Sequence, residues 1–418
     1  MIAIRELDLV VIGGGPAGLA AAIEAKKQGV EQILILENDP VLGGILKQCI
    51  HNGFGLHTFK EELTGPEYAA RFVAQCAELG IESKIDTSVL EIDDDLGILV
   101  SSEADGLYRL KPKAIIYATG CRERTRGAIS IPGTRPSGVY HAGLAQRYMN
   151  LDNYKIGSRA FILGSGDIGL IMARRMKLEG MEVLGVAELM PYSNGLNRNL
   201  VQCLQDYDIP LFLSHTISRI DGKERLTGVE IVQVDGNRNP IAGTERYFEV
   251  DTLLMSVGLI PEHELLRPLG VKIDSKTNGI FVDSYMQSNV AGLFACGNVV
   301  HVHDLVDFVS SEGQLAGFHA AKYIQQGLPV QHEIHTKPGN KVSYLVPQVL
   351  KLPTYQAHVK VYYRVKQVLK DVVVRITKDG EVIRELKKKH MAPGEMESVL
   401  LDLNQLQGCK ELQVEVIE

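Results

Sequence analysis

The hydrophobic pattern of the chain opens with a largely apolar stretch, residues 7–12, that runs directly into a glycine-rich sequence. Residues 17–28 then follow a helical pattern, and residues 32–36 form a second apolar stretch. This order predicts a strand, a tight turn, a helix and a second strand, the βαβ unit of a parallel sheet. The sequence of the turn is Gly13-Gly14-Gly15-Pro16-Ala17-Gly18.

The same pattern returns about 150 residues later. The apolar stretch 160–163 leads into a second glycine-rich turn, residues 170–179 are helical in pattern, and 182–187 form the next predicted strand. The sequence of this second turn is Gly164-Ser165-Gly166-Asp167-Ile168-Gly169.

Each turn predicts a site for the pyrophosphate of a dinucleotide, because glycine lets the backbone approach the phosphates at the positive end of a helix. An acid ends the second strand of each unit, Glu37 in the first and Glu188 in the second. A carboxylate there accepts hydrogen bonds from a ribose 2'-OH and repels a 2'-phosphate, so Glu188 favours NADH over NADPH. A nearby arginine would reverse this preference, and the candidates are Arg174, Arg175 and Arg198.

Shorter strands follow the two units. Residues 114–117 are apolar and end at Ala118-Thr119-Gly120, and residues 252–257 end at Gly258. A last short strand runs to Gly297-Asn298, so that the polar Asn298 emerges at its carboxyl end. An amphipathic helix is expected from 310 to 325.

The composition changes beyond residue 330. Residues 359–364, 372–377 and 411–416 alternate in the manner of half-buried strands, and Lys378-Asp379-Gly380 is typical of a hairpin turn. We therefore expect a separate, mainly β domain over 331–418, with a possible role in docking a partner.

Charge excludes some partners. The formal net charge of −7 argues against nucleic acid or an anionic membrane, and the basic run Lys387-Lys388-Lys389-His390 is expected on a solvated turn or edge. Charged residues and glycines interrupt residues 7–23, so we expect no membrane span and a cytoplasmic location. The six cysteines form no CxxC pair, which supports neither a disulfide framework nor an iron–sulfur cluster.

On these motifs and their order, the first 330 residues resemble the pyridine nucleotide-disulfide oxidoreductases in the broad sense. The resemblance implies an α/β fold with two Rossmann-like domains, an FAD domain (1–150 and 256–330) and an inserted NAD(H) domain (151–255). It assigns FAD to Gly13, Gly15, Pro16, Ala17, Gly18, Glu37, Asn38, Gly43, Gly44, Ala118, Thr119, Gly120, Gly297 and Asn298. It assigns NADH to Gly164, Gly166, Asp167, Ile168, Gly169, Glu188 and Gly258.

The chain departs from this family pattern at two places. Asn298 stands where the family usually has aspartate, and an amide still hydrogen-bonds a ribitol without carrying charge. Only Cys49 follows Gly43-Gly44, where some disulfide reductases carry a redox pair, so disulfide reduction is not expected.

Residues 43–55 and 300–309 narrow the resemblance. They look like the flavoprotein that accompanies a glycerol-3-phosphate dehydrogenase, and like subunits of opine dehydrogenase, hydrogen cyanide synthase and sarcosine oxidase. Some of those relatives carry a cysteine-rich cluster-binding tail, whereas the tail here contains only Cys409. The resemblance implies a hetero-oligomer with a glycerol-3-phosphate dehydrogenase-type subunit.

Candidate catalytic groups lie near the expected flavin. Cys49 could act as a charge-transfer thiolate or reduce peroxide, activated by a cation such as Lys47. The alternative is that it packs under the flavin as a small apolar residue. Lys47 would stabilise a reduced flavin, and His51 and His57 would bond the flavin or act on peroxide; the alternative for each is a surface or loop role.

Two further histidines, His301 and His303, suggest a metal, but two ligands rarely suffice. We therefore expect no metal and place these imidazoles at the pyrimidine edge of the flavin. Asp304 and Asp307 are expected to cap the following helix.

The sequence thus predicts an FAD-dependent NADH oxidase or dehydrogenase. Electrons would pass from NADH through FAD to oxygen, giving hydrogen peroxide, or to a partner flavoprotein. The alternatives are a subunit of a heteromeric amine or opine dehydrogenase, and an assembly subunit with a minor redox role.

Overall fold

The computed structural model describes residues 4–329, 332–353 and 355–418. The chain forms two compact units. One combines Met1–Cys121 with Pro261–Glu418, and the other is the insertion Arg122–Ile260. The predicted α/β architecture, with two Rossmann-like sheets and a small β domain, is confirmed.

A seven-stranded sheet lies at the centre of the first unit, in the order β5-β2-β1-β8-β7-β6, with β19 also paired to β8. Its central strands are parallel and buried, because their apolar side chains face helices and loops on both sides. The strands are β1 (Ile4–Ile12), β2 (Ile33–Leu36), β5 (Glu82–Lys84), β6 (Thr87–Ile92), β7 (Ile98–Ser102), β8 (Gly106–Tyr117) and β19 (Leu293–Ala295).

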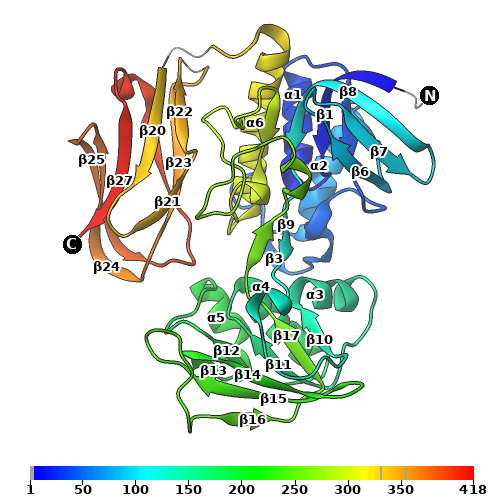
Figure 1. Cartoon of the computed structure of the whole chain (residues 1–418), viewed down its shortest axis with the longest axis vertical. Helices are drawn as coiled ribbons and strands as arrows, with labels where there is room; N and C mark the ends of the chain where they lie inside the picture. Colours follow the sequence, from blue (N-terminus) through cyan, green and yellow to red (C-terminus); the bar gives the residue numbers. More distant parts are fainter. Residues whose placement is uncertain (1–3, 330–331, 354) are drawn as a thin grey trace. The chain divides into compact units, whose positions relative to one another are not determined.

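Three helices belong to this sheet: α1 (Pro16–Lys27), α2 (Gly65–Glu78) and α6 (Val306–Gln326). Figure 1 shows α1 and α6 running side by side, and glycines of α6 make their close approach possible. The helix expected over 310–325 therefore exists and begins earlier, at Val306. A short hairpin of β3 (Asn52–Phe54) and β4 (Leu63–Thr64) precedes α2.

The second unit contains a parallel five-stranded sheet in the order β10-β17-β11-β12-β13 and an antiparallel sheet of three strands. It begins ahead of the predicted residue 151, because β10 pairs with β17 and so completes the sheet. The parallel strands are β10 (Val139–His141), β11 (Arg159–Leu163), β12 (Glu182–Glu188), β13 (Leu211–Leu213) and β17 (Thr252–Met255). The antiparallel strands are β14 (His215–Gly222), β15 (Leu226–Gln233) and β16 (Arg246–Phe248).

The helices of this unit are α3 (Ala142–Asn150), α4 (Asp167–Leu178) and α5 (Asn197–Cys203). Helix α4 follows the second glycine turn, as α1 follows the first. The chain enters and leaves the unit through two paired strands, β9 (Cys121–Glu123) and β18 (Leu259–Pro261).

The C-terminal domain is a two-layer β structure with its own apolar core. One sheet has the order β22-β20-β27-β24-β25 and the other β21-β23-β26. The hairpin turn at Asp379-Gly380 is confirmed, and the basic run lies on the edge strand β25. The strands are β20 (His332–Pro338), β21 (Val342–Val346), β22 (Val349–Leu352), β23 (His358–Val365), β24 (Leu369–Lys378), β25 (Glu381–Met391), β26 (Glu397–Asp402) and β27 (Glu411–Ile417).

Among the residues that the structure describes, no helix is long and apolar enough to cross a membrane.

Candidate functional site

The first glycine turn connects β1 to α1 and is closed on one side. Gly13 has a φ of +106°, and a Cβ there would lie 2.4 Å from the carbonyl oxygen of Ala118. A Cβ on Gly18 would lie 1.9 Å from the carbonyl oxygen of Gly13. At Gly15, by contrast, a Cβ would meet nothing within 4 Å. The turn is therefore packed against β8 and open beside the N-terminus of α1, the arrangement that accommodates a pyrophosphate.

Glu37 lies at the end of β2 and is buried. Its Oε2 accepts a hydrogen bond of 2.8 Å from the amide of Gly14, and its Oε1 accepts one of 2.9 Å from the amide of Asp39. These two bonds hold the carboxylate beside the glycine turn while each oxygen keeps a lone pair for a ribose hydroxyl.

Other segments assigned to FAD meet at this turn. The amide of Gly43 donates to the carbonyl of Gly14 at 2.8 Å, and a Cβ on Gly44 would lie 3.1 Å from the Cα of Gly15. A Cβ on Gly297 would lie 2.8 Å from the Cβ of Ala17. The segments of Gly43-Gly44 and Gly297 therefore lie close to the first glycine turn.

The remaining residues assigned to FAD come from three separate parts of the chain. Thr119 donates to the carbonyl of Glu262 at 2.7 Å, which ties the Ala118-Thr119-Gly120 segment to the strand returning from the insertion. Asn298 accepts a hydrogen bond from the amide of His303, and Asn38 is exposed next to Glu37.

The second glycine turn resembles the first in its packing, but it is less open, because a Cβ on Gly166, the counterpart of Gly15, would lie 3.2 Å from Ser256 Oγ. Gly164 has a φ of +95°, and its Cβ would lie 2.1 Å from the carbonyl oxygen of Ser256. Glu188 Oε2 accepts hydrogen bonds from the amide and hydroxyl of Ser165 at 2.9 and 2.6 Å, and Oε1 accepts one from the amide of Met190 at 2.9 Å. In both units the carboxylate bonds a turn amide 23 residues earlier and the amide two residues later.

Asp167 behaves differently from its counterpart Pro16. Its Oδ1 accepts hydrogen bonds from the amide of Leu196 and the side chain of Asn199, at 2.8 and 2.7 Å. The carboxylate therefore holds the segment before α5 against the second turn. Among the arginine candidates, Arg175 pairs with Glu179 at 2.8 Å on its own helix.

The loop after the first turn carries three of the candidate catalytic residues. Lys47 lies in a short 3-10 turn, Gly44–Gln48, and its stem packs over Gly43. The carbonyl of Cys49 accepts a hydrogen bond of 2.9 Å from the amide of Gly65, and the ring of His51 packs on Phe54. Of these three residues, Lys47 is tied to the first glycine turn, through its contact with Gly43.

Cys49 is held as a neutral thiol. Burial raises its pKa to about 12, and its Sγ donates to the carbonyl of Ile45 at 3.3 Å. A thiolate is the reactive form of cysteine, and this environment disfavours it at neutral pH. A role for Cys49 in electron transfer stays a prediction.

His303 belongs to a buried cluster centred on Glu312 of α6. Glu312 Oε1 accepts a hydrogen bond of 2.9 Å from His301 Nε2, and Oε2 accepts bonds of 3.2 Å from His303 Nε2 and 2.6 Å from the Gly297 amide. Burial lowers the pKa of His301 to about 4, so that imidazole is neutral. Both imidazoles thus turn their Nε2 atoms to this carboxylate, and their place at the pyrimidine edge of the flavin stays a prediction.

The ligand atoms of His301, His303 and Glu312 all lie within 4.8 Å of one another, a geometry that is also compatible with a metal ion. The carboxylate is already bonded by both imidazoles. The prediction that the protein holds no metal stays a prediction.

Asp304 and Asp307 do not cap α6, contrary to expectation. Asp307 lies in the first turn of α6, but its carboxylate accepts hydrogen bonds from the amides of Gly55 and Thr58. Asp304 forms an ion pair with Arg364 of β23 and accepts a hydrogen bond from the amide of Met396. Both acids connect distant segments, which local sequence cannot reveal.

Two residues of the site were not predicted from the sequence. Ser256, at the end of β17, packs against Gly164 and accepts a hydrogen bond of 3.1 Å from the amide of Gly169. Its position just before Gly258 was the available signal. Glu312 gave no signal, because an acid on an amphipathic helix is ordinarily exposed.

The described geometry agrees with comparisons to known proteins. A family model described as pyridine nucleotide-disulphide oxidoreductase matches residues 7–327. A dihydrolipoyl dehydrogenase of Acholeplasma laidlawii is 28% identical over 76% of this chain and 97% of its own length. An NADH oxidase of Methanocaldococcus jannaschii is 26% identical over 76% of this chain and 68% of the relative.

Among solved structures, a thioredoxin reductase of T. acidophilum has 25% sequence identity and a TM-score of 0.61, and the match covers 76% of this chain and 98% of that one. The family match ends before the C-terminal β domain.

Proposed function

Because the chain belongs to the pyridine nucleotide-disulphide oxidoreductase family, whose members bind FAD and a pyridine nucleotide, we propose that it is an FAD-dependent NADH oxidase or dehydrogenase. The observation that carries the proposal is the duplicated arrangement of glycine turn and carboxylate. Glu37 and Glu188 each bond the backbone of their own turn in the same way. Two such sites are what an enzyme needs to hold two dinucleotides.

The first turn is assigned to FAD and the second to the nicotinamide nucleotide. When bound, FAD supplies a two-electron acceptor for NADH and a donor to oxygen or to another flavoprotein. The chain's own contribution is to bind and orient the two nucleotides, with Glu37 and Glu188 accepting ribose hydroxyls and the two glycine turns facing the phosphates.

NADH is the proposed substrate over NADPH. Glu188 is buried at the end of β12, where a 2'-phosphate would meet its carboxylate. Arg175, which would offset that repulsion, is engaged by Glu179.

The proposed acceptors are oxygen, with hydrogen peroxide as product, and a partner flavoprotein of the glycerol-3-phosphate dehydrogenase type. The sequence places no second cysteine near Cys49, and its half-buried thiol, whose pKa is raised to about 12, does not favour thiol exchange. The partner rests on the resemblance of residues 43–55 and 300–309.

Anaerobic stopped-flow reduction tests the proposal. The purified flavoprotein is mixed with NADH or NADPH while the flavin absorbance is followed, then mixed with oxygen and assayed for peroxide. We expect rapid bleaching by NADH, slower bleaching by NADPH, and peroxide on reoxidation. If neither nucleotide bleaches the flavin, the proposal is wrong.

A further inference from the structure

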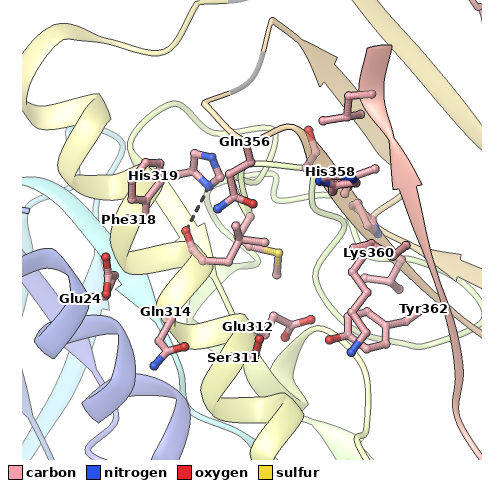
Figure 2. Close-up of a pocket in the computed structure, with 18 residues that line it drawn as sticks. Glu24, Ser311, Glu312, Gln314, Phe318, His319, Gln356, His358, Lys360 and Tyr362 are labelled. Carbon is pink, nitrogen blue, oxygen red and sulfur yellow. Dashed lines mark hydrogen bonds between the residues drawn. The ribbon is translucent and has the colours of Figure 1, made fainter. Parts of the chain in front are cut away.

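A cavity of about 430 Å³ lies in the first unit between α6 and the C-terminal β domain. Its volume is that of a pocket for a small molecule. Its wall includes Glu24 of α1, Glu312 and His319 of α6, and His358, Lys360 and Tyr362 of β23. Figure 2 shows the helix residues on one side of the space and the strand residues on the other. None of the residues assigned to FAD or NADH belongs to the described wall of this cavity.

One wall carries a positive charge without a counter-charge. His358, Lys360 and Tyr362 alternate along β23, so their side chains share one face of the strand. The ammonium of Lys360 lies 4.1 Å from the ring centre of Phe308 and 4.8 Å from that of Tyr362. Within the described ranges no carboxylate lies at ion-pair distance from Lys360, and partial burial lowers the pKa of its ammonium.

The helix side offers an unused hydrogen-bond acceptor. His319 is 2% exposed, and its Nδ1 donates to the carbonyl of Leu315 at 3.0 Å. That bond leaves Nε2 as the acceptor, and Nε2 has no partner among the described residues. Burial lowers the pKa of His319 to about 4, so the lone pair is available at neutral pH.

These features restrict the chemistry of an occupant. A cation would be repelled by Lys360, and a purely apolar molecule would leave the lone pair of His319 unpaired. A polyanion would also meet the carboxylates of Glu24 and Glu312, which lie on the helix side of the cavity. A small molecule with one anionic group and a hydroxyl satisfies both walls.

We propose that this cavity is a binding site for a small hydroxylated organic anion, whose carboxylate or phosphate group pairs with Lys360 while its hydroxyl donates to His319. The site is separate from the nucleotide turns. Glu312 connects the two regions, because it lines the cavity and also bonds the amide of Gly297.

Titration calorimetry on the full-length flavoprotein, in a buffer without phosphate or carboxylate, tests the site. The probes are glycerate and glycerol 1-phosphate. Glycerol serves as the analogue that lacks the anionic group, and propionate as the one that lacks hydroxyls. We expect saturable binding of at least one of these two hydroxylated anions with a Kd between about 1 μM and 1 mM. The anion that binds more tightly shows whether the site prefers a carboxylate or a phosphate group. We expect no binding of glycerol and weaker binding of propionate than of glycerate.

Variants locate the binding. Lys360→Met keeps the apolar stem and is expected to weaken binding at least about 10-fold, whereas Lys360→Arg retains it. Lys322→Met is the matched control, because Lys322 also lies over an aromatic ring, that of Phe318, but does not line the cavity. We expect the Kd of the Lys322→Met variant for the anion to stay within about two-fold of that of the original protein.

Absence of saturable binding of both anions at about 10 mM would overturn the proposal. Equal affinity in the original protein and in a Lys360→Met variant with unchanged flavin content would overturn it too. Equal binding of propionate and glycerate would remove the assignment of His319.

Discussion

At the scale of single residues, two carboxylates with the same surroundings are assigned different tasks. Glu37 and Glu188 each end a buried strand and each bond two backbone amides. A glutamine in either place would set an amide NH2 against a backbone NH, and each unmade bond costs about 1–3 kcal/mol. The two positions therefore allow the assignment of FAD and NADH to be tested by one kind of substitution.

We predict that Glu37→Gln lowers the FAD content of the purified protein, whereas Glu188→Gln keeps FAD and raises the KM for NADH about 10-fold or more. Glu188→Gln should also narrow the preference for NADH over NADPH, because the repelling charge is gone. The measurements are flavin absorbance per chain and steady-state kinetics with both nucleotides. Glu182→Gln, at the exposed start of the same strand, is the control. Loss of FAD from the Glu188 variant alone would contradict the assignment.

A second residue-scale prediction concerns acid sensitivity. The pKa of His319 is about 4 in the folded protein and near 6.5 when the chain unfolds, so below pH 6.5 the unfolded state binds a proton that the folded state does not. The stability that the neutral, buried imidazole of His319 contributes is present above pH 6.5 and is lost as the pH falls towards 4. Between pH 7 and 4.5, the free energy of unfolding of the His319→Gln variant should therefore fall by about 1–3 kcal/mol less than that of the original protein.

Urea unfolding at several pH values measures this difference. His358→Gln, at an exposed histidine, should leave the acid sensitivity unchanged. Equal pH slopes for the original protein and the His319 variant would contradict the prediction.

At the scale of elements, the contact between α1 and α6 depends on glycines. A Cβ on Gly313 would lie 2.2 Å from the carbonyl oxygen of Ala17, and one on Gly317 would lie 2.1 Å from that of Ala21. Both obstacles are backbone atoms of α1, which cannot move without displacing the helix that follows the first glycine turn.

We predict that Gly317→Ala lowers the free energy of unfolding by about 2–4 kcal/mol, because α6 must move away from α1. The control is Gly236→Ala, in an exposed loop where a Cβ meets nothing within 4 Å, and its effect should stay within about 0.5 kcal/mol. Chemical denaturation followed by circular dichroism measures both. A Gly317 variant as stable as the original would show that the helices tolerate separation.

The elements also show what the sequence could predict. Glycine turns, buried strands and the acids at their ends follow from local patterns, and the structure contains both βαβ units and the C-terminal strands at the expected places. The amphipathic pattern located α6, but not α1 as the helix it packs against, because glycine contributes no apolar side chain. The bonds of Asp304 and Asp307 join segments distant in the chain, so no local sequence pattern predicts them.

At the scale of the whole molecule, the C-terminal domain is integrated into the first unit. Tyr344 and Val346 of β21 belong to the same apolar cluster as β1 and α1. Lys351 of β22 pairs with the buried Asp283 at 2.8 Å, and Arg364 pairs with Asp304. A domain expected from the sequence to be separable therefore covers part of the first domain's core.

The contacts of the C-terminal domain with the rest of the first unit predict what truncating the chain at Gln331 does. Removing the domain exposes apolar surface and leaves Asp283 and Asp304 without their partners, so we predict a lower thermal midpoint, by roughly 5–10 °C, and a lower FAD content. Arg364→Met removes the ion pair with Asp304 together with the hydrogen bond to the carbonyl of Val302, and it should cost about 1–3 kcal/mol. Arg375→Met, whose partner Glu385 is exposed, should cost less than about 1 kcal/mol. A truncated chain that keeps its flavin and its melting temperature would show that the domain is a separable appendage, and its function would then be sought in partner docking alone.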